Sequence, residues 1–234
     1  MDTIFSQSFL RENLMGPNCV RIIHEMFEGI ELPSGIRILD LGCGTALTSI
    51  YLAKKYQAQV FAVDMWINPT ENYKCIEVFE LTDKIIPVYA DASMGLPFAK
   101  GYFDLIVSVD AYHYFGTADT YLDDKIAPLI KSGGQIRVAI PGLQRDFADD
   151  DVPEEMQPYW QEVKHFDSAN WWENLWRKSQ LINVEGCSSL KCHEQAWLDW
   201  LACDNPHAKH DIDMVAAEGG KYFDTIQIVG RKKQ

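Results

Sequence analysis

The sequence has few of the features that mark membrane, secreted or nucleic-acid-binding proteins. No stretch approaches the roughly 20 uncharged apolar residues of a membrane-spanning helix, and residues 1–13 lack the basic-then-apolar order of a signal peptide. Basic residues are also scarce, because 21 Lys and Arg face 34 Asp and Glu and leave a net charge of −13. A field of that sign repels phosphate backbones. We therefore expect a cytoplasmic protein without a membrane or nucleic-acid partner.

Cysteine motifs are missing as well. The six cysteines are scattered and form no C-x-x-C pair, so free thiols are expected. One C-terminal group contains the right residue types for zinc, namely Cys192, His193, Cys203, His207 and His210. Its first two members are adjacent and cannot easily share one tetrahedral ion. We therefore predict no metal.

What the sequence does contain fits one α/β domain. The chain has 234 residues, of which 47% are hydrophobic, enough to bury a full core. Apolar runs alternate with helical spacing. Strands are expected at 36–41, 59–64, 85–90, 103–109, 135–140, 181–187 and 222–230, and helices at 45–56, 70–83, 119–131, 169–178, 193–202 and 211–217.

The stretch from Ile36 to Leu47 organises the rest of the chain. It is an apolar run that ends at Asp40, passes through Gly42 and Gly44, and then takes on a helical pattern. Glycines let a ligand approach the main chain, and the N–H groups of a new helix face the same place. A small molecule with an anionic group is expected there, against Asp40, Gly42, Cys43, Gly44 and Thr45.

Two further strands also end in acids. Asp64 lies 20 residues after Gly44, where a carboxylate can accept both hydroxyls of a ribose; it could instead cap the turn that follows. Met65 and Trp66 offer apolar faces to a base, unless Trp66 belongs to the core. With Asp91, three carboxylates meet at one sheet edge, which favours a ligand with a positive centre over a dinucleotide diphosphate.

The fourth strand ends in Asp110, Tyr112, His113 and Tyr114. A histidine that titrates near neutrality is the commonest general base. His113 is therefore the candidate base, with Tyr112 or Tyr114 orienting the acceptor. The alternative is a structural histidine that hydrogen-bonds a backbone carbonyl.

Two segments are candidates for covering the site. Residues 1–30 predict two helices separated by Met15, Gly16 and Pro17, which form either a lid or a surface hairpin. Residues 141–180 form an insertion with an acidic run and several tryptophans. Trp160, Trp171 and Trp172 could wall an apolar pocket. Alternatively, a helix over 169–178 buries Trp172 and Trp176 in ordinary packing.

These motifs together resemble the class I S-adenosylmethionine-dependent methyltransferases, in particular the small-molecule branch that includes cyclopropane-synthase-like and quinone-biosynthesis-type enzymes. The residues that carry the resemblance are the D-x-G-x-G signature 40–44, Asp64, Asp91 with Ala92, and the approaches to strands four and five at 96–106 and 129–134. Many members have a third glycine where this chain has Ala46. The resemblance covers 36–140 well and the C-terminal strands more loosely.

The resemblance implies a doubly wound, mostly parallel seven-stranded sheet with helices on both faces and an antiparallel final strand. The implied organisation is a lid at 1–30, a cofactor-binding core at 31–140, a substrate-covering insertion at 141–180 and C-terminal elements at 181–234. Gly42 and Gly44 would contact the methionine part of S-adenosylmethionine, and Asp40 its amino group. Asp64 would hold the ribose, while Asp91 and Ala92 would contact the adenine. Asp110 is grouped with these cofactor-binding residues.

The implied activity is methyl transfer to an O, N, S or C atom of a small molecule by in-line displacement, in a monomer or homodimer. Two other classes stay open. One is a protein that binds the cofactor without transferring the methyl group. The other is a nicotinamide enzyme, which calls for a third glycine where this chain has Leu47.

Overall fold

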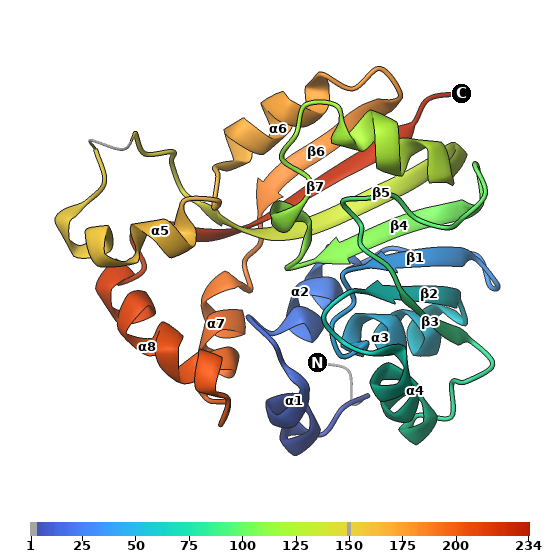
Figure 1. Ribbon diagram of the computed structural model, residues 1–234, viewed down its shortest axis with the longest axis horizontal. Coiled ribbons are helices and arrows are strands. Elements are labelled where there is room, and N and C mark those ends of the chain that lie inside the picture. The colour runs from blue at the N-terminus through green and yellow to red at the C-terminus, as the bar shows by residue number, and fades with distance from the viewer. Residues whose placement is uncertain (1–3, 149–150) are drawn as a thin grey trace.

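A seven-stranded sheet forms the centre of the computed structural model, which describes residues 4–148 and 151–234 (Figure 1). The strand order is β3-β2-β1-β4-β5-β7-β6. β7 runs in the opposite direction to the other six strands, so it pairs antiparallel with both β5 and β6. The strands are β1 (Arg37–Leu41), β2 (Gln59–Asp64), β3 (Ile85–Tyr89), β4 (Phe103–Val109), β5 (Ile130–Leu143), β6 (Ile182–Ser189) and β7 (Phe223–Lys232). The predicted fold class is confirmed, including the antiparallel final strand.

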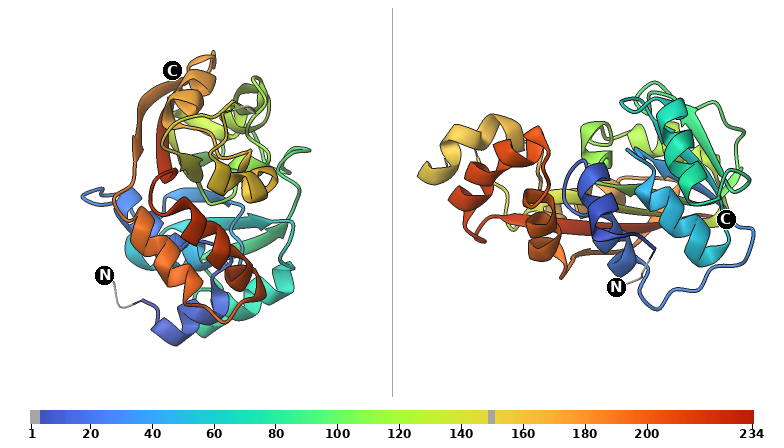
Figure 2. Two further views of the ribbon diagram at one scale, coloured as in Figure 1. Left: turned by 90° about the vertical axis from the view of Figure 1, so that its left-hand side faces the viewer. Right: turned by 90° about the horizontal axis from the view of Figure 1, so that it is seen from below.

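Helices cover both faces of this sheet (Figures 1 and 2). The α-helices are α1 (Gln7–Asn13), α2 (Cys19–Met26), α3 (Leu47–Tyr56), α4 (Pro69–Val78), α5 (Trp160–Val163), α6 (Ala169–Arg177), α7 (His193–Leu201) and α8 (Pro206–Glu218). Shorter turns are η1 (Tyr112–Tyr114), η2 (Leu122–Ile126), η3 (Ala127–Leu129) and η4 (Glu154–Tyr159). In the described part of the chain, no helix has the length and apolarity needed to cross a membrane.

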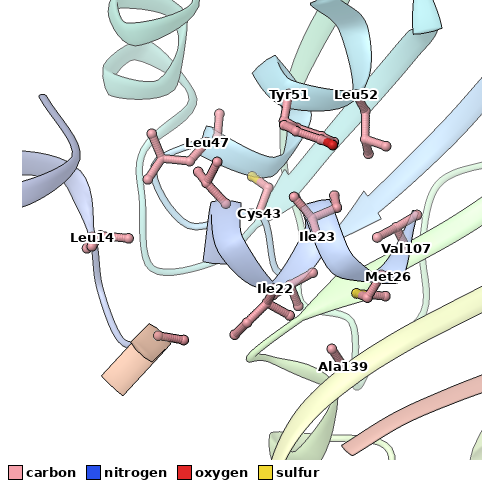
Figure 3. Packing of buried hydrophobic residues seen from close by; sticks show 14 of the residues in the cluster. Leu14, Ile22, Ile23, Met26, Cys43, Leu47, Tyr51, Leu52, Val107 and Ala139 are labelled. Atoms are coloured by element: carbon pink, nitrogen blue, oxygen red, sulfur yellow. The ribbon is translucent and has the colours of Figure 1, made fainter. Parts of the chain in front are cut away.

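Two hydrophobic clusters lie on opposite faces of the sheet, because successive strand residues point to opposite sides. Ile38 belongs to the cluster under α2 and α3, whereas its neighbour Leu39 belongs to the cluster under α6. Figure 3 shows Ile23 of α2 among Leu52 of α3 and Val107 of β4. The packing of α2 onto the sheet also positions the loop between α1 and α2.

The helix predicted over 119–131 is wrong. The chain there forms the π turn η2 and the 3₁₀ turn η3, and β5 already begins at Ile130. Pro128 explains the difference, because proline lacks the N–H that an α-helix needs and clashes with the preceding turn. β5 is also longer than expected. It passes Gly133 with φ +75°, where the register against β4 shifts.

Proline is tolerated near the other end of β5 for a geometric reason. The last β4 pairing joins Val109 to Ala139, so Pro141 lies beyond β4 and pairs only with Thr225 of β7. Smaller differences concern helix ends: α4 stops at Val78, ahead of the predicted end at residue 83, and α8 starts at Pro206. Of the predicted acidic run, Asp149 and Asp150 lie outside the described residues.

Candidate functional site

A pocket opens at the carboxyl ends of β1, β2 and β4, next to the loop between α1 and α2. It contains about 940 Å³ of space, part of it open to solvent. Residues from the N-terminal loop, the three strand ends and the segment after β4 share its wall. They are Asn13, Met15, Gly16, Pro17, Cys19, Gly42, Cys43, Gly44, Thr45, Thr48, Val63, Asp64, Met65, Trp66, Ala90, Ala92, Val109, Asp110, Ala111, Tyr114 and Phe115.

The glycine turn after β1 forms the floor of the pocket. Gly42 and Gly44 have φ of +74° and +52°, a region that side chains other than glycine rarely enter. The N–H groups of Gly42 and Cys43 donate to the carbonyl of Val63, at 2.8 and 3.0 Å. A Cβ on Gly42 would lie 2.3 Å from the Cβ of Ala111. The turn is therefore a bare stretch of backbone held between β2 and β4.

Asp64 is fixed at the side of this turn. Its Oδ2 accepts a hydrogen bond from the N–H of Gly44 at 2.8 Å. Its Oδ1 accepts from the N–H groups of Trp66 and Ile67, at 2.7 and 2.9 Å. A carboxylate has about four lone-pair positions, so Asp64 can still accept one hydroxyl from a ligand. The turn-capping role considered for Asp64 is thus present, and it also orients the carboxylate in the pocket wall.

Asp40 occupies a different environment from Asp64. It is fully buried and does not line the pocket. Its Oδ2 accepts from the hydroxyls of Thr48 and Ser49, both at 2.6 Å, and Oδ1 has no partner. Burial raises the pKa of this carboxyl to about 6. Through these hydrogen bonds, Asp40 holds the first turn of α3 beneath the glycine turn. Its carboxylate does not belong to the pocket wall.

Asp91 also lies outside the wall, although its neighbour Ala92 lines the pocket. The Oδ1 atom of Asp91 accepts hydrogen bonds from the N–H of Ser93 at 2.8 Å and from its hydroxyl at 2.7 Å. These bonds lower the pKa of Asp91. The expectation that acids at strand ends line the site therefore identified the right segment, but the Asp91 carboxylate binds Ser93 in its own loop.

The loop between α1 and α2 contributes Met15, Gly16 and Pro17 to the wall, as the lid prediction requires. The hydroxyl of Thr45 donates to the carbonyl of Asn13 at 2.6 Å, which ties this loop to the glycine turn. Asn18 caps α2 by accepting from the N–H groups of Val20 and Arg21. The loop is thus held at both ends.

Asp110 follows β4 in the left-handed region, with φ +57°, and lines the pocket. A Cβ on Gly16 would lie 2.2 Å from its Oδ2, so the lid loop passes directly over this carboxylate. Burial, followed by the charge of Asp211 on α8, raises the pKa of Asp110 to about 7.

Of the three residues predicted to be catalytic, only Tyr114 lines the pocket. Tyr112 is fully buried against Trp172 and Trp176, because η1 directs it to the sheet face under α6. His113 is 4% exposed, stacks on Tyr114 with ring centroids 4.0 Å apart, and its Nδ1 has no hydrogen-bond partner. Burial lowers its pKa to about 3. The structure thus does not bring these three side chains together in the pocket.

The three tryptophans of the insertion, Trp160, Trp171 and Trp172, do not line the pocket, whereas Trp66 does. Trp172 and Trp176 are buried on one face of α6, the i, i+4 arrangement that the alternative interpretation described, and α6 packs on β6 and β7. Trp171 contacts Trp172, and Trp160 packs on Phe147. In the described residues, no group of three His, Cys, Asp or Glu side chains has a metal-binding arrangement.

Several pocket residues were not singled out from the sequence. Val63 and Val109 immediately precede the strand-end acids, and Ala90 and Ala111 flank such acids, so the strand-end rule could have included them. Asn13, Cys19, Thr48 and Phe115 carry no such signal. Their position depends on how α1, α2 and the segment after β4 pack around the turn.

Comparisons with known proteins agree with this geometry. Residues 38–134 match the family model of a methyltransferase domain. Methyltransferase GfsG from Streptomyces halstedii is 27% identical over 120 residues, which are 51% of this chain and 42% of that protein. The 2-methyl-6-phytyl-1,4-hydroquinone methyltransferase of a Synechocystis strain is 31% identical over 123 residues, which are 51% of this chain and 37% of that protein. The chain thus spans about two fifths of the length of these curated relatives.

A similar solved structure extends the likeness to the whole fold. It is phosphoethanolamine N-methyltransferase 2 of Haemonchus contortus in complex with S-adenosyl-L-methionine, with a TM-score of 0.71 and 16% identity. The alignment covers 99% of this chain and 58% of that one. At this identity the comparison establishes the fold.

Proposed function

We propose that this chain, which has the fold of a solved methyltransferase and matches a methyltransferase-domain model over residues 38–134, binds S-adenosylmethionine in this pocket and transfers the methyl group to a small molecule. The acceptor atom is O, N, S or C. The observation that carries the proposal is the bare glycine turn with Asp64 fixed beside it, at 2.8 Å from the N–H of Gly44. The solved relative that holds this cofactor supports the assignment.

The residues of the pocket fit such a cofactor. A side chain on Gly42 would meet Ala111, so this floor has room only for backbone, and a ligand can approach it closely. Asp64 keeps about one lone-pair position, on Oδ2, for a ribose hydroxyl. Met65, Trp66 and Ala92 offer apolar surface to the adenine. Asp91 binds Ser93 through Oδ1 and would contact the adenine through Oδ2. Asp40 would act on the amino group through the turn above it.

In this proposal the chain acts by holding the two reactants in line and excluding water. Bound S-adenosylmethionine supplies a methyl group that its sulfonium already activates. Met15 and Pro17 of the lid loop shield the pocket, and Tyr114 extends its wall toward the acceptor. Orientation of this kind lowers the barrier substantially without further chemistry. His113 remains a proposed base, although its low pKa and its position outside the wall favour a mechanism based on proximity.

Asp64→Ala tests the cofactor assignment. We expect calorimetry to show that S-adenosylmethionine binds at least about tenfold more weakly, because charge-assisted hydrogen bonds contribute about 1.5–3 kcal/mol each. Asp83→Ala removes the same charge at an exposed turn and should leave the affinity unchanged. Unchanged affinity in Asp64→Ala would refute the ribose assignment. A screen of small molecules with a labelled methyl donor then tests transfer itself.

The position of His113 and Tyr112 outside the pocket favours one second candidate, a protein that binds the cofactor without transfer. Tight S-adenosylmethionine binding with no labelled product in that screen would support it. A nicotinamide enzyme would bind NAD in the same calorimetric assay. Leu47, where that class needs glycine, is buried at the start of α3, which argues against it.

We also propose a cytoplasmic location and a monomer or homodimer without a membrane or nucleic-acid partner. The net charge of −13 and the six free cysteines support this proposal.

A further inference from the structure

Two carboxylates line the pocket, and they differ in what they already bind. Asp64 accepts three backbone N–H hydrogen bonds. The carboxylate of Asp110 makes no hydrogen bond or ion pair with any described residue, although it faces the same pocket. The wall contains no Lys, Arg or His side chain among the described residues. The charge of Asp110 is therefore available to a cationic ligand.

The sheet places Asp110 away from the ribose end of the pocket. Asp64 ends β2 and Asp110 follows β4, with β1 between them. Two strand spacings separate these positions by about 10 Å. Gly16 of the lid covers the carboxylate from outside. With the ribose assigned to Asp64 in the proposed function, the free carboxylate lies on the side of the pocket that remains for an acceptor.

An aromatic ring lies near Asp110 in the pocket. Tyr114 lines the wall there, and its ring centroid is 5.2 Å from that of Trp66, which lines the wall next to Asp64. They are 61% and 63% exposed, so their faces are not used by the core. Aromatic faces beside a carboxylate attract ammonium groups, since the ring quadrupole and the negative charge act in the same direction.

The surrounding charges strengthen this preference. The groups that interact electrostatically with Asp110 are Asp211 on α8, Cys19 on α2 and Tyr114. The indole N–H of Trp200 donates to Oδ2 of Asp211 at 2.8 Å, which holds that carboxylate in place. None of these neighbours is cationic, so a bound cation would relieve the repulsion between the two acids.

We propose that Asp110 selects a protonated amine as the methyl acceptor, with the ring of Tyr114 packing on its apolar part. This rests on the proposed function. The ammonium group gives one proton to the Asp110 carboxylate. The freed nitrogen lone pair then forms the N–C bond to the methyl carbon as the C–S bond breaks, and that electron pair stays on sulfur. The methylated nitrogen carries the positive charge, and Asp110 returns its proton to solvent on release.

Asp110→Asn tests the proposal, because asparagine tolerates the left-handed φ of this position. The probes are 2-phenylethylamine and its near-isostere 2-phenylethanol, titrated at pH 8 into protein loaded with S-adenosylhomocysteine. We expect the native protein to prefer the amine, and Asp110→Asn to weaken amine binding about tenfold or more. Affinity for the alcohol and for S-adenosylhomocysteine should stay unchanged. Asp213→Asn, an exposed acid on α8, is the control for net charge.

The outcomes separate this inference from the proposed function. Equal binding of amine and alcohol overturns the inference, and so does weaker S-adenosylhomocysteine binding in Asp110→Asn, which would make Asp110 a cofactor ligand. If the amine is preferred but no methyl group reaches it, the proposed function fails and the assignment of Asp110 stands. Lowering the pH from 8 to 5 should weaken amine binding only where Asp110 is present, because its pKa is about 7.

Discussion

Gly42 and Ala111 approach so closely that a Cβ added to Gly42 would lie 2.3 Å from the Cβ of Ala111. Gly42 follows β1 and Ala111 follows β4, while the N–H of Gly42 donates to Val63 of β2. One residue therefore links three neighbouring strand ends. The floor of the pocket keeps its shape only while this position has no side chain.

Gly42→Ala should lower both stability and cofactor affinity. A left-handed φ costs a residue with a Cβ about 1–2 kcal/mol, and overpacking adds about 1–3 kcal/mol. Gly133→Ala is the matched control, because φ is +75° there and a Cβ would meet nothing within 4 Å. Urea unfolding should show a small loss for the control and a larger one for Gly42→Ala. Only Gly42→Ala should weaken S-adenosylmethionine in calorimetry; equal behaviour of the two variants would contradict this account of the floor.

The substitution His113→Phe tests whether the candidate base exchanges a proton during turnover. Phenylalanine keeps a ring that can stack on Tyr114 and Phe166 but carries no proton. A pKa of about 3 leaves His113 neutral throughout the range from pH 5 to 9. We expect the rate of methyl transfer to change by only a few-fold and its pH profile to keep its shape. A loss of about 10²-fold or more, with cofactor affinity intact, would instead establish general base catalysis by His113.

The sequence sufficed to predict the sheet and the donor side of the site. Strands and the glycine turn depend on local patterns, namely β-branched runs, two glycines one residue apart, and an acid at or near the ends of the first four strands. Asp64 is in the wall for this reason. Asp91 and Asp40 follow the same pattern, yet local hydrogen bonds to Ser93 and to the start of α3 turn them away.

Side chains after β4 were harder to predict, because their direction depends on backbone geometry that the pattern does not encode. The short turn η1 sends Tyr112 into the core, and positive φ at Asp110 leaves its carboxylate in the pocket. The α-helix expected at 119–131 does not form, because Pro128 cannot continue an α-helix, and the apolar spacing alone does not reveal this. Cys19 enters the wall through the packing of α2, which only the folded chain reveals.

Trp172→Ala should act on stability and leave the site intact. Trp172 is fully buried against Tyr112 in the cluster under α6. Removing a buried tryptophan side chain costs about 3–5 kcal/mol. Trp171→Ala, which removes a partly exposed ring from the same helix, should cost less. Denaturant unfolding measures both, and S-adenosylmethionine affinity should match that of the native protein in each. Weaker cofactor binding with full stability would restore the tryptophan wall that the sequence suggested.

Asp40 should make the protein less stable as the pH rises. Its folded-state pKa of about 6 exceeds the usual 3.8, so between these values the native state binds more protons than the unfolded state. The free energy of unfolding therefore falls across this range through Asp40 and is level above it. Asp40→Asn keeps an oxygen for Thr48 and Ser49 but cannot ionise.

The measurement is the difference in unfolding free energy between Asp40→Asn and the native protein, determined in urea at successive pH values. Each pKa unit corresponds to about 1.4 kcal/mol, so the difference should shift toward the variant by about 2 kcal/mol between pH 4 and pH 6.5. Asp83→Asn, at an exposed turn, supplies the control and should follow the native curve. Parallel curves for Asp40→Asn would show that this buried carboxyl titrates normally.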